Sequence, residues 1–194
     1  MNPKEWIKTL QTPDEIDFSK SLFEKILSKS IADSEIYFEY LVIRLIAAIN
    51  NFKNLEFDMK LDENFEPVSV APGGKFDLKV TFDKIELICE VTLRPISGKV
   101  DHFSHIEYPD RQIGFLFVQN IQNVDSNVWN TYKVYSKQNG KLFMICDIPF
   151  LLRLLENQQT AHEKLLEFIK NSKEIWLSED SWKNIREKIV TLIT

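Results

Sequence analysis

The chain has 194 residues, a length that suits one domain with its own hydrophobic core. Apolar residues make up 44% of the sequence and aromatic residues 12%, which excludes a disordered chain. The 24 Lys and Arg residues against 29 Asp and Glu leave a net charge of −5. This acidity argues against a protein that binds nucleic acid without help, because such proteins normally carry a basic face or tail.

Nothing in the sequence indicates export or a membrane. Residues 1–18 lack the basic-then-apolar pattern of a signal peptide. The longest apolar stretch, 41–49, is interrupted by Arg44 and is much shorter than the roughly 20 residues that span a bilayer. Cys89 and Cys146 both lie in apolar runs, so we expect buried free thiols. We therefore expect a soluble cytoplasmic protein without a membrane partner.

The hydrophobic pattern predicts one domain over residues 1–194. In chain order, it predicts a helix over 12–28, a buried helix over 34–51, a strand over 55–60, and a β-hairpin of strands 75–82 and 84–93. A short helix ended by Pro109 follows, then a strand over 113–119, a helix over 126–138 capped by Asp125, and a strand over 141–147. Helices over 149–157, 160–172 and 178–193 form a helical C-terminal part from about residue 148. This order predicts an α/β or α+β domain with a mixed central sheet and helices on both faces.

The second strand of the hairpin carries acidic groups within an otherwise apolar sequence. One of its faces is uniformly apolar and must pack on the core, while the other is formed by Glu86, Ile88, Glu90, Thr92 and Arg94. On the first strand, Asp77 follows a turn at Pro72-Gly73-Gly74. A hairpin can therefore bring Asp77 and Glu90 side by side, in a cleft lined by the polar face.

Two carboxylates a few ångströms apart repel each other unless a positive group lies between them. Mg²⁺ is the usual solution, because it prefers oxygen ligands, and the backbone carbonyl of Val91 could complete the set. Such a cation can bind a phosphodiester and activate water. The alternative is that Asp77 and Glu90 are solvated acids at the edge of the sheet, and their spacing alone leaves both interpretations open.

Four short blocks occur in order between residues 38 and 93: Phe38-Glu39-Tyr40, then KNLEFDMKLDE, then Ala71-Pro72-Gly73 with Asp77, and finally Glu90-Val91-Thr92-Leu93. This series resembles the PD-(D/E)xK nucleases. It is more similar to the AlwI-like family of type IIS and nicking restriction endonucleases, particularly to the small catalytic subunits of heterodimeric members. The resemblance implies a restriction-endonuclease-like α/β fold, with a mixed central sheet flanked by helices.

The resemblance also implies roles for individual residues. It makes Asp77 and Glu90 the main ligands of Mg²⁺, for which Mn²⁺ should substitute, and Glu39 a third carboxylate near the metal or its water. The alternative for Glu39 is a capping or ion-pair role with Arg44. Thr92 stands where most of these enzymes carry a lysine, but the AlwI-like group accepts Ser or Thr there.

The segment after the hairpin matches the family less well. Family members place a further Glu and then an Arg-His pair on the next helix, and this chain has no Arg-His pair. His105 and Glu107 are candidates for a general base and a second-metal ligand, or they belong to a solvated helix face. His102 and Arg111 receive no role, and Arg94 is the nearest positive substitute for the missing lysine.

Two further features permit a structural and a functional interpretation. Trp129, Tyr132 and Tyr135 recur at helical spacing, which is more typical of a core or partner-facing stripe than of a base-stacking surface. His162 has charged sequence neighbours, and we expect it to be exposed.

The resulting prediction is a metal-dependent DNA endonuclease cleavage subunit that hydrolyses a phosphodiester bond in one strand of double-stranded DNA. Lacking its own recognition domain, it would need a larger partner subunit for site-specific cutting. Two alternatives remain open: a catalytically inactive interaction subunit with the nuclease fold, or a metal nuclease acting on RNA or branched DNA.

Overall fold

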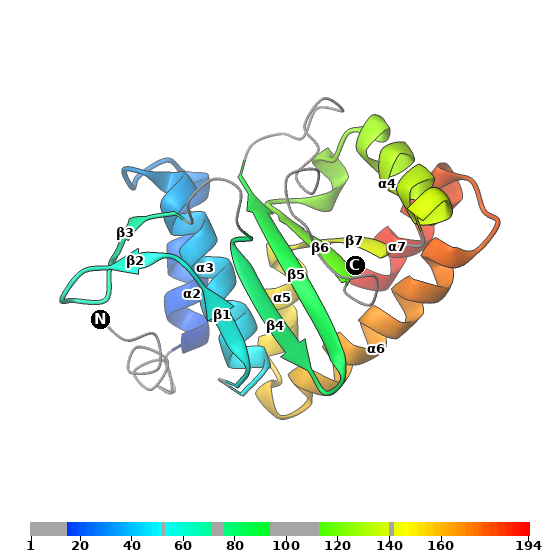
Figure 1. Ribbon diagram of the computed structural model, residues 1–194. Coiled ribbons are helices and arrows are strands. Elements are labelled where there is room, and N and C mark those ends of the chain that lie inside the picture. The colour runs from blue at the N-terminus through cyan, green and yellow to red at the C-terminus, as the bar shows by residue number, and fades with distance from the viewer. Residues whose placement is uncertain (1–14, 52, 71–75, 94–112, 140–141) are drawn as a thin grey trace.

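The computed structural model describes residues 15–51, 53–70, 76–93, 113–139 and 142–194. Its centre is a five-stranded sheet with the order β1-β4-β5-β6-β7 (Figure 1). The strands are β1 (Leu55–Phe57), β4 (Leu78–Phe82), β5 (Ile85–Thr92), β6 (Ile113–Val118) and β7 (Leu142–Asp147). The β1–β4 and β4–β5 pairs are antiparallel, while the β5–β6 and β6–β7 pairs are parallel, so the sheet is mixed. A separate hairpin pairs β2 (Lys60–Leu61) with β3 (Pro67–Ser69).

The parallel part of the sheet forms its most buried region. Every residue of β6 and β7 is buried, as their continuous apolar sequences require of strands covered on both faces. In β4, by contrast, burial alternates along the strand. The β5 strand lies between these two regions, and it therefore carries its polar side chains into a mostly apolar interior.

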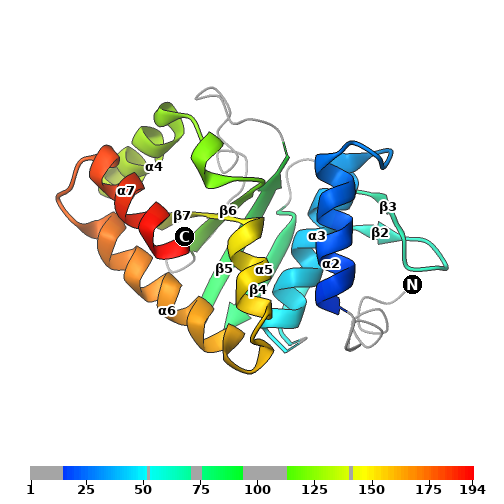
Figure 2. The same cartoon turned by 180° about the vertical axis from the view of Figure 1, so that it is seen from behind.

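Helices flank the sheet. They are α2 (Glu15–Leu27), α3 (Ser34–Ile49), α4 (Ser126–Asn139), α5 (Ile148–Leu155), α6 (Gln158–Leu177) and α7 (Trp182–Ile193), with a short 3₁₀ helix at Ile121–Asn123. In Figure 2, α2, α3 and α5 lie in front of the sheet, whereas α4 lies on its far side, where it connects β6 to β7. Of the helices described, none is long and apolar enough to cross a membrane.

The predicted elements largely agree with this architecture. The fold class, a mixed central sheet flanked by helices, is confirmed, and so are the hairpin, the later strands and the helices within the described residues. The predicted strand over 55–60 is wrong in its extent, because the chain leaves the main sheet at Asp58 and enters the small hairpin at Lys60. Strand β3 and the 3₁₀ helix had no counterpart in the prediction. The predicted helix before Pro109 lies outside the described residues.

The core confirms the structural interpretation of the aromatic stripe. Trp129 and Tyr132 are fully buried, and Trp129 stacks on Trp176 of α6 with ring centroids 5.6 Å apart. Tyr132 stacks on Phe143 of β7 at 5.0 Å. These rings therefore fasten α4 to α6 and to the sheet and leave no exposed surface for bases. The Tyr135 side chain lies outside the described residues. Both cysteines are buried and free, as expected.

Candidate active site

The register of the β4–β5 hairpin determines where Asp77 and Glu90 lie. A two-residue turn at Asp83 and Lys84, with Asp83 in the left-handed region (φ 53°), pairs Phe82 with Ile85 at one end and Leu78 with Cys89 at the other. Asp77 precedes Leu78, where the regular pairing ends, and its N–H donates to the Cys89 carbonyl, so it lies beside Glu90 at an irregular end of the ladder. The sequence-based prediction that the hairpin brings these two acids together agrees with this geometry.

Asp77 is fixed by the two peptide groups that flank Glu90. Its backbone N–H donates to the carbonyl of Cys89 at 3.2 Å, and its Oδ2 accepts from the N–H of Val91 at 2.7 Å. The N–H and C=O of one strand residue point to the same side of the strand, so the Val91 carbonyl is turned toward Asp77 as well. The Asp77 carboxylate and the Val91 carbonyl therefore lie on the same side of β5.

Glu90 is a buried acid, only 5% exposed, and in the part of the chain that the structure describes its Oε1 has no hydrogen-bond partner. Burial, then the charge of Asp77, then the charge of Glu39 raise the pKa of Glu90 to about 9. Burial also raises the pKa of Asp77 to about 6, although its bond from Val91 acts in the opposite direction. A carboxyl group buried among other acids is costly to ionise, and a cation would remove that cost.

Glu39 brings a third carboxyl group from α3. It is 4% exposed, and its charge contributes to the raised pKa of Glu90, which shows that α3 carries it toward the hairpin. Arg44, the ion-pair partner considered from the sequence, instead donates to Glu15 of α2 and to the hydroxyl of Tyr40. Sequence reasoning missed this Glu15–Arg44 pair, because 29 residues separate its members and no motif connects them.

The remaining predicted residues divide into two groups. Thr92 ends β5 on the same side of the strand as Glu90 and is buried, so it adds a hydroxyl but no charge near the acids. The other group lies outside the described residues: Arg94, His102, His105, Glu107 and Arg111.

The donor set of this cluster fits a hard divalent cation. It offers the Glu90 oxygen that has no partner among the described residues, together with the Asp77 carboxylate and the Val91 carbonyl, all of them oxygen ligands. Within the described residues, no three His, Cys, Asp or Glu side chains are grouped as a metal site. Two carboxylates and a carbonyl, with water and substrate oxygens, are the arrangement that Mg²⁺ commonly uses at phosphates.

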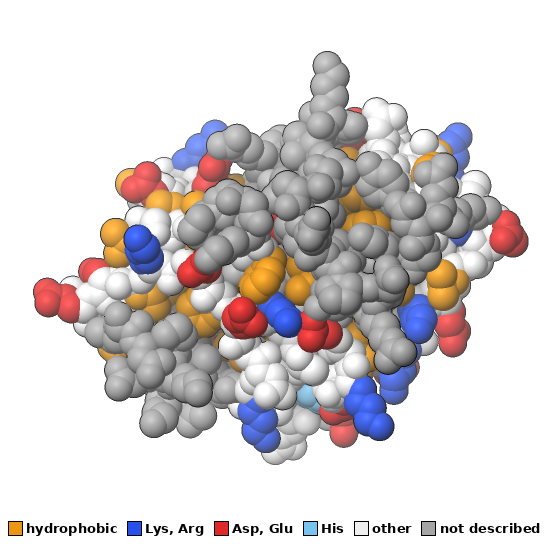
Figure 3. Space-filling view, viewed as in Figure 1, with side chains coloured by type: hydrophobic (Ala, Val, Ile, Leu, Met, Phe, Trp, Pro, Cys, Tyr) orange, Lys and Arg blue, Asp and Glu red, His pale blue; other side chains and the backbone are white. Residues whose placement is uncertain are grey.

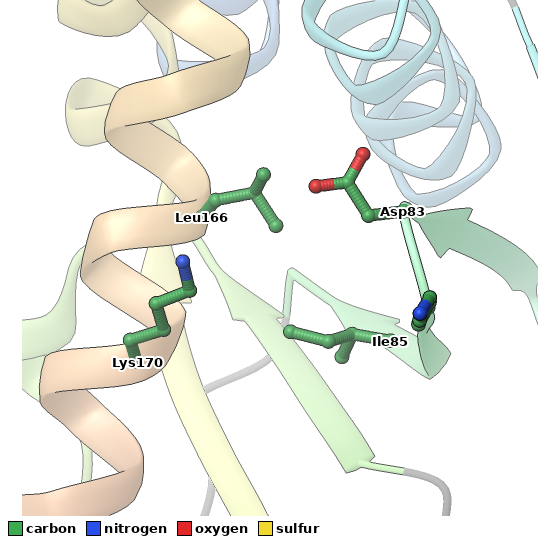
Figure 4. Close-up of a pocket in the computed structure, with 5 residues that line it drawn as sticks. Asp83, Ile85, Leu166 and Lys170 are labelled. Atoms are coloured by element: carbon green, nitrogen blue, oxygen red, sulfur yellow. The ribbon is translucent and has the colours of Figure 1, made fainter.

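A pocket of about 580 Å³ lies at the other end of the hairpin, between the β4–β5 turn and α6 (Figure 4). It is lined by Asp83, Lys84, Ile85, Leu166 and Lys170. Ile85 and Glu90 are five residues apart on β5, about 16 Å along the strand. The pocket is therefore separate from the carboxylate cluster.

His162, at the same end of the hairpin, is not the exposed residue that the sequence predicted. It is partly buried, its Nε2 lies 3.8 Å from Asp83 Oδ1, and its ring lies 5.4 Å from that of Phe82. The expectation failed because it considered only sequence neighbours, whereas α6 packs across the turn that contains Asp83.

Comparison with known proteins defines the class. The family model for AlwI restriction endonuclease matches residues 2–102, which is more than half of the chain. The chain therefore belongs to the AlwI restriction endonuclease family, as the sequence motifs predicted, and the matched region contains Glu39, Asp77 and Glu90.

Among solved structures, the fold is similar to that of the small subunit of the heterodimeric restriction endonuclease R.BspD6I. The TM-score is 0.64 at 15% sequence identity, covering 93% of this chain and 97% of the other. No curated protein sequence matches significantly. At this identity the likeness supports a shared fold, which extends over the C-terminal half that the family model leaves unmatched.

Proposed function

We propose that this protein is a divalent-metal-dependent DNA endonuclease subunit that hydrolyses a phosphodiester of one strand. The observation that carries the proposal is the buried Glu90 oxygen, which has no hydrogen-bond partner within the described residues, near Asp77, whose carboxylate accepts from the Val91 N–H. A purely structural acid at this depth would be expected to have a hydrogen-bond or ion-pair partner for each oxygen. Membership of a restriction endonuclease family supports the same conclusion.

We assign one group of residues to binding the metal ion and another to orienting and deprotonating the attacking water. Asp77, Glu90 and the Val91 carbonyl would hold Mg²⁺ or Mn²⁺, with the hydrogen bond from Val91 keeping Asp77 oriented. The cation would supply the positive charge that phosphodiester hydrolysis requires. Glu39 is the group we assign to orienting the attacking water and accepting its proton, since it is a buried carboxyl on another element whose charge acts on Glu90. Thr92 offers a hydroxyl, while His105 and Glu107 remain candidates for a general base and a second-metal ligand.

We further propose that site-specific cutting needs a larger partner subunit that binds double-stranded DNA in the cytoplasm. The net charge of −5 supports this, because it predicts weak affinity of the isolated chain for DNA. Figure 3 shows the Lys and Arg side chains of one face scattered among Asp and Glu. The similar small subunit belongs to a heterodimeric enzyme, which supports the same division of labour.

The test compares two variants of one strand. Glu90→Gln should abolish nicking of supercoiled plasmid in Mg²⁺ or Mn²⁺ and weaken Mn²⁺ binding measured by calorimetry. Glu86→Gln is the matched control: it lies four residues earlier on β5, in a partly exposed ion pair with Lys79 at 3.1 Å. Glu86→Gln should retain both plasmid nicking and Mn²⁺ binding. The proposal fails if Glu90→Gln, and likewise Asp77→Ala, cuts and binds Mn²⁺ like the wild type.

The rival function is a catalytically inactive subunit with the nuclease fold. Its basis is the neutral Thr92, at the position where most PD-(D/E)xK nucleases carry a lysine, although the AlwI-like group accepts Ser or Thr there. Mn²⁺ binding separates the two functions before any substrate is known. A chain that binds Mn²⁺ through Asp77 and Glu90 retains the metal site that an inactive subunit does not require.

A further inference from the structure

Tyr40, the residue after Glu39 on α3, connects α3 to the β2–β3 loop through one buried hydroxyl. The hydroxyl donates to the carbonyl of Phe65 at 2.8 Å and accepts from Nη1 of Arg44 at 2.8 Å. Tyr40 is only 1% exposed, so water cannot readily replace either bond. The side chain thus ties α3 to the loop between β2 and β3.

Arg44 is itself held from the opposite side by α2. Its Nε and Nη2 donate to the two carboxylate oxygens of Glu15 at 2.8 and 2.5 Å, and its guanidinium lies 4.0 Å from the ring centre of Phe18. The side chains of Arg44 and Glu15 are 12% and 7% exposed. A bidentate, largely desolvated pair of this kind is geometrically rigid, so α2 fixes the direction from which Arg44 reaches Tyr40.

The loop on the other side of Tyr40 is equally well defined. Phe65 has a φ of 64°, in the left-handed region, which costs a bulky residue about 1 kcal/mol. Asp62 Oδ1 supports the turn by accepting from the N–H groups of Asn64 and Glu66 at 2.8 and 2.9 Å. The Phe65 carbonyl therefore offers Tyr40 a fixed anchor.

The carboxylate cluster has one member whose place the hairpin does not determine. Asp77 and Glu90 are fastened to each other through Cys89 and Val91, whereas Glu39 comes from α3. We propose that Tyr40 is a positioning residue: its doubly anchored hydroxyl fixes the rotation of α3 at Glu39 and thereby the distance of the third carboxyl group from Glu90. This inference rests on the proposed function, because it concerns the same cluster.

Tyr40→Phe removes a single oxygen, and Tyr37→Phe is its matched control. Tyr37 lies three residues earlier on α3 and donates to Glu66 Oε2 at 3.1 Å in an exposed position, where water can replace the bond. For Tyr40→Phe we expect the Mn²⁺ dissociation constant to rise about tenfold and kcat for plasmid nicking to fall by about 10- to 100-fold, with KM almost unchanged. Tyr37→Phe should change neither quantity by more than about twofold.

A double-mutant cycle with Glu39→Gln separates positioning from general loosening of the fold. If Tyr40 acts through Glu39, Tyr40→Phe has no further effect on Mn²⁺ affinity in the Glu39→Gln protein. All measurements are made well below the melting temperature of each variant, since a purely structural role would lower that temperature but leave Mn²⁺ affinity intact.

Two results would overturn the positioning role: a folded Tyr40→Phe protein with wild-type Mn²⁺ affinity and kcat, or a Tyr40→Phe effect that persists undiminished without Glu39. Failure of the proposed function itself gives a different result. In that case the wild type shows no Mn²⁺ binding that Asp77→Ala removes, and the role of Tyr40 falls together with it.

Discussion

Replacing Glu90 by Gln should stabilise the metal-free protein while abolishing its activity. The buried carboxyl of Glu90 is neutral in the folded protein at pH 7, because burial and the neighbouring acids raise its pKa to about 9. In the unfolded chain the same group ionises with its ordinary pKa of 4.5. Ionisation therefore favours the unfolded state, and stability falls as the pH rises from about 4.5 to about 9.

The size of the effect follows from the difference between pH 7 and the unfolded pKa. Keeping Glu90 protonated over these 2.5 units costs about 3 kcal/mol at 1.36 kcal/mol per unit. A glutamine removes this term, and its amide N–H groups can donate to the carboxylate of Asp77. For a chain of this length, the gain corresponds to a rise in melting temperature of roughly 6–12 °C.

Thermal unfolding followed by circular dichroism in EDTA measures this difference. Glu90→Gln and the wild type should melt together near pH 4.5 and diverge progressively toward pH 8.5. Glu86→Gln, which breaks the partly exposed pair with Lys79, should follow the wild type within about 1 kcal/mol at every pH. A Glu90→Gln protein that melts at or below the wild type at pH 7, with no divergence at higher pH, would refute the reasoning.

Three further predictions concern the cation and the core. Mg²⁺ at 100 times its dissociation constant should stabilise the wild type by about 2.7 kcal/mol and so raise its melting temperature, but should not affect Glu90→Gln; equal shifts would place the ion elsewhere. Glu15→Gln should destabilise the protein by about 3–5 kcal/mol in urea titrations, because it leaves Arg44 buried without its partner; a loss below about 1 kcal/mol would show that water reaches the pair. Trp129→Ala should cost about 3–5 kcal/mol and alter the near-ultraviolet circular dichroism of Trp176; an unchanged spectrum would contradict the stacked arrangement.

The acidic pair was predictable because its geometry is local. A two-residue turn at Asp83 and Lys84 sets the register, and the alternation of the strand sets the face, so the proximity of Asp77 and Glu90 followed from sequence spacing. The family resemblance added Glu39, which no spacing rule connects to the hairpin. Neither prediction required knowing how the helices pack on the sheet.

What the sequence could not predict depends on tertiary contacts. The strand over 55–60 contains no Gly or Pro to mark its division, so the departure of the chain at Asp58 toward the small hairpin left no local signal. His162 was misplaced because Asp83, its neighbour in space, lies 79 residues away. The ion-pair partner of Arg44 was also unpredictable, because Glu15 belongs to another helix, α2.

The hairpin turn has a consequence for how the length of this segment can vary. Because side chains alternate along a strand, a one-residue shift of the β4–β5 register at Asp83-Lys84 would bring Cys89, which faces the other side of β5, to the place beside Asp77 that Glu90 occupies. The turn lies on the surface, far from the carboxylates, where insertions are normally tolerated. Here the strand register that an exposed turn sets is constrained by the carboxylate site about 16 Å away. Natural variants of the turn should therefore either keep its length or enlarge it as a loop that leaves the pairing of the two strands intact.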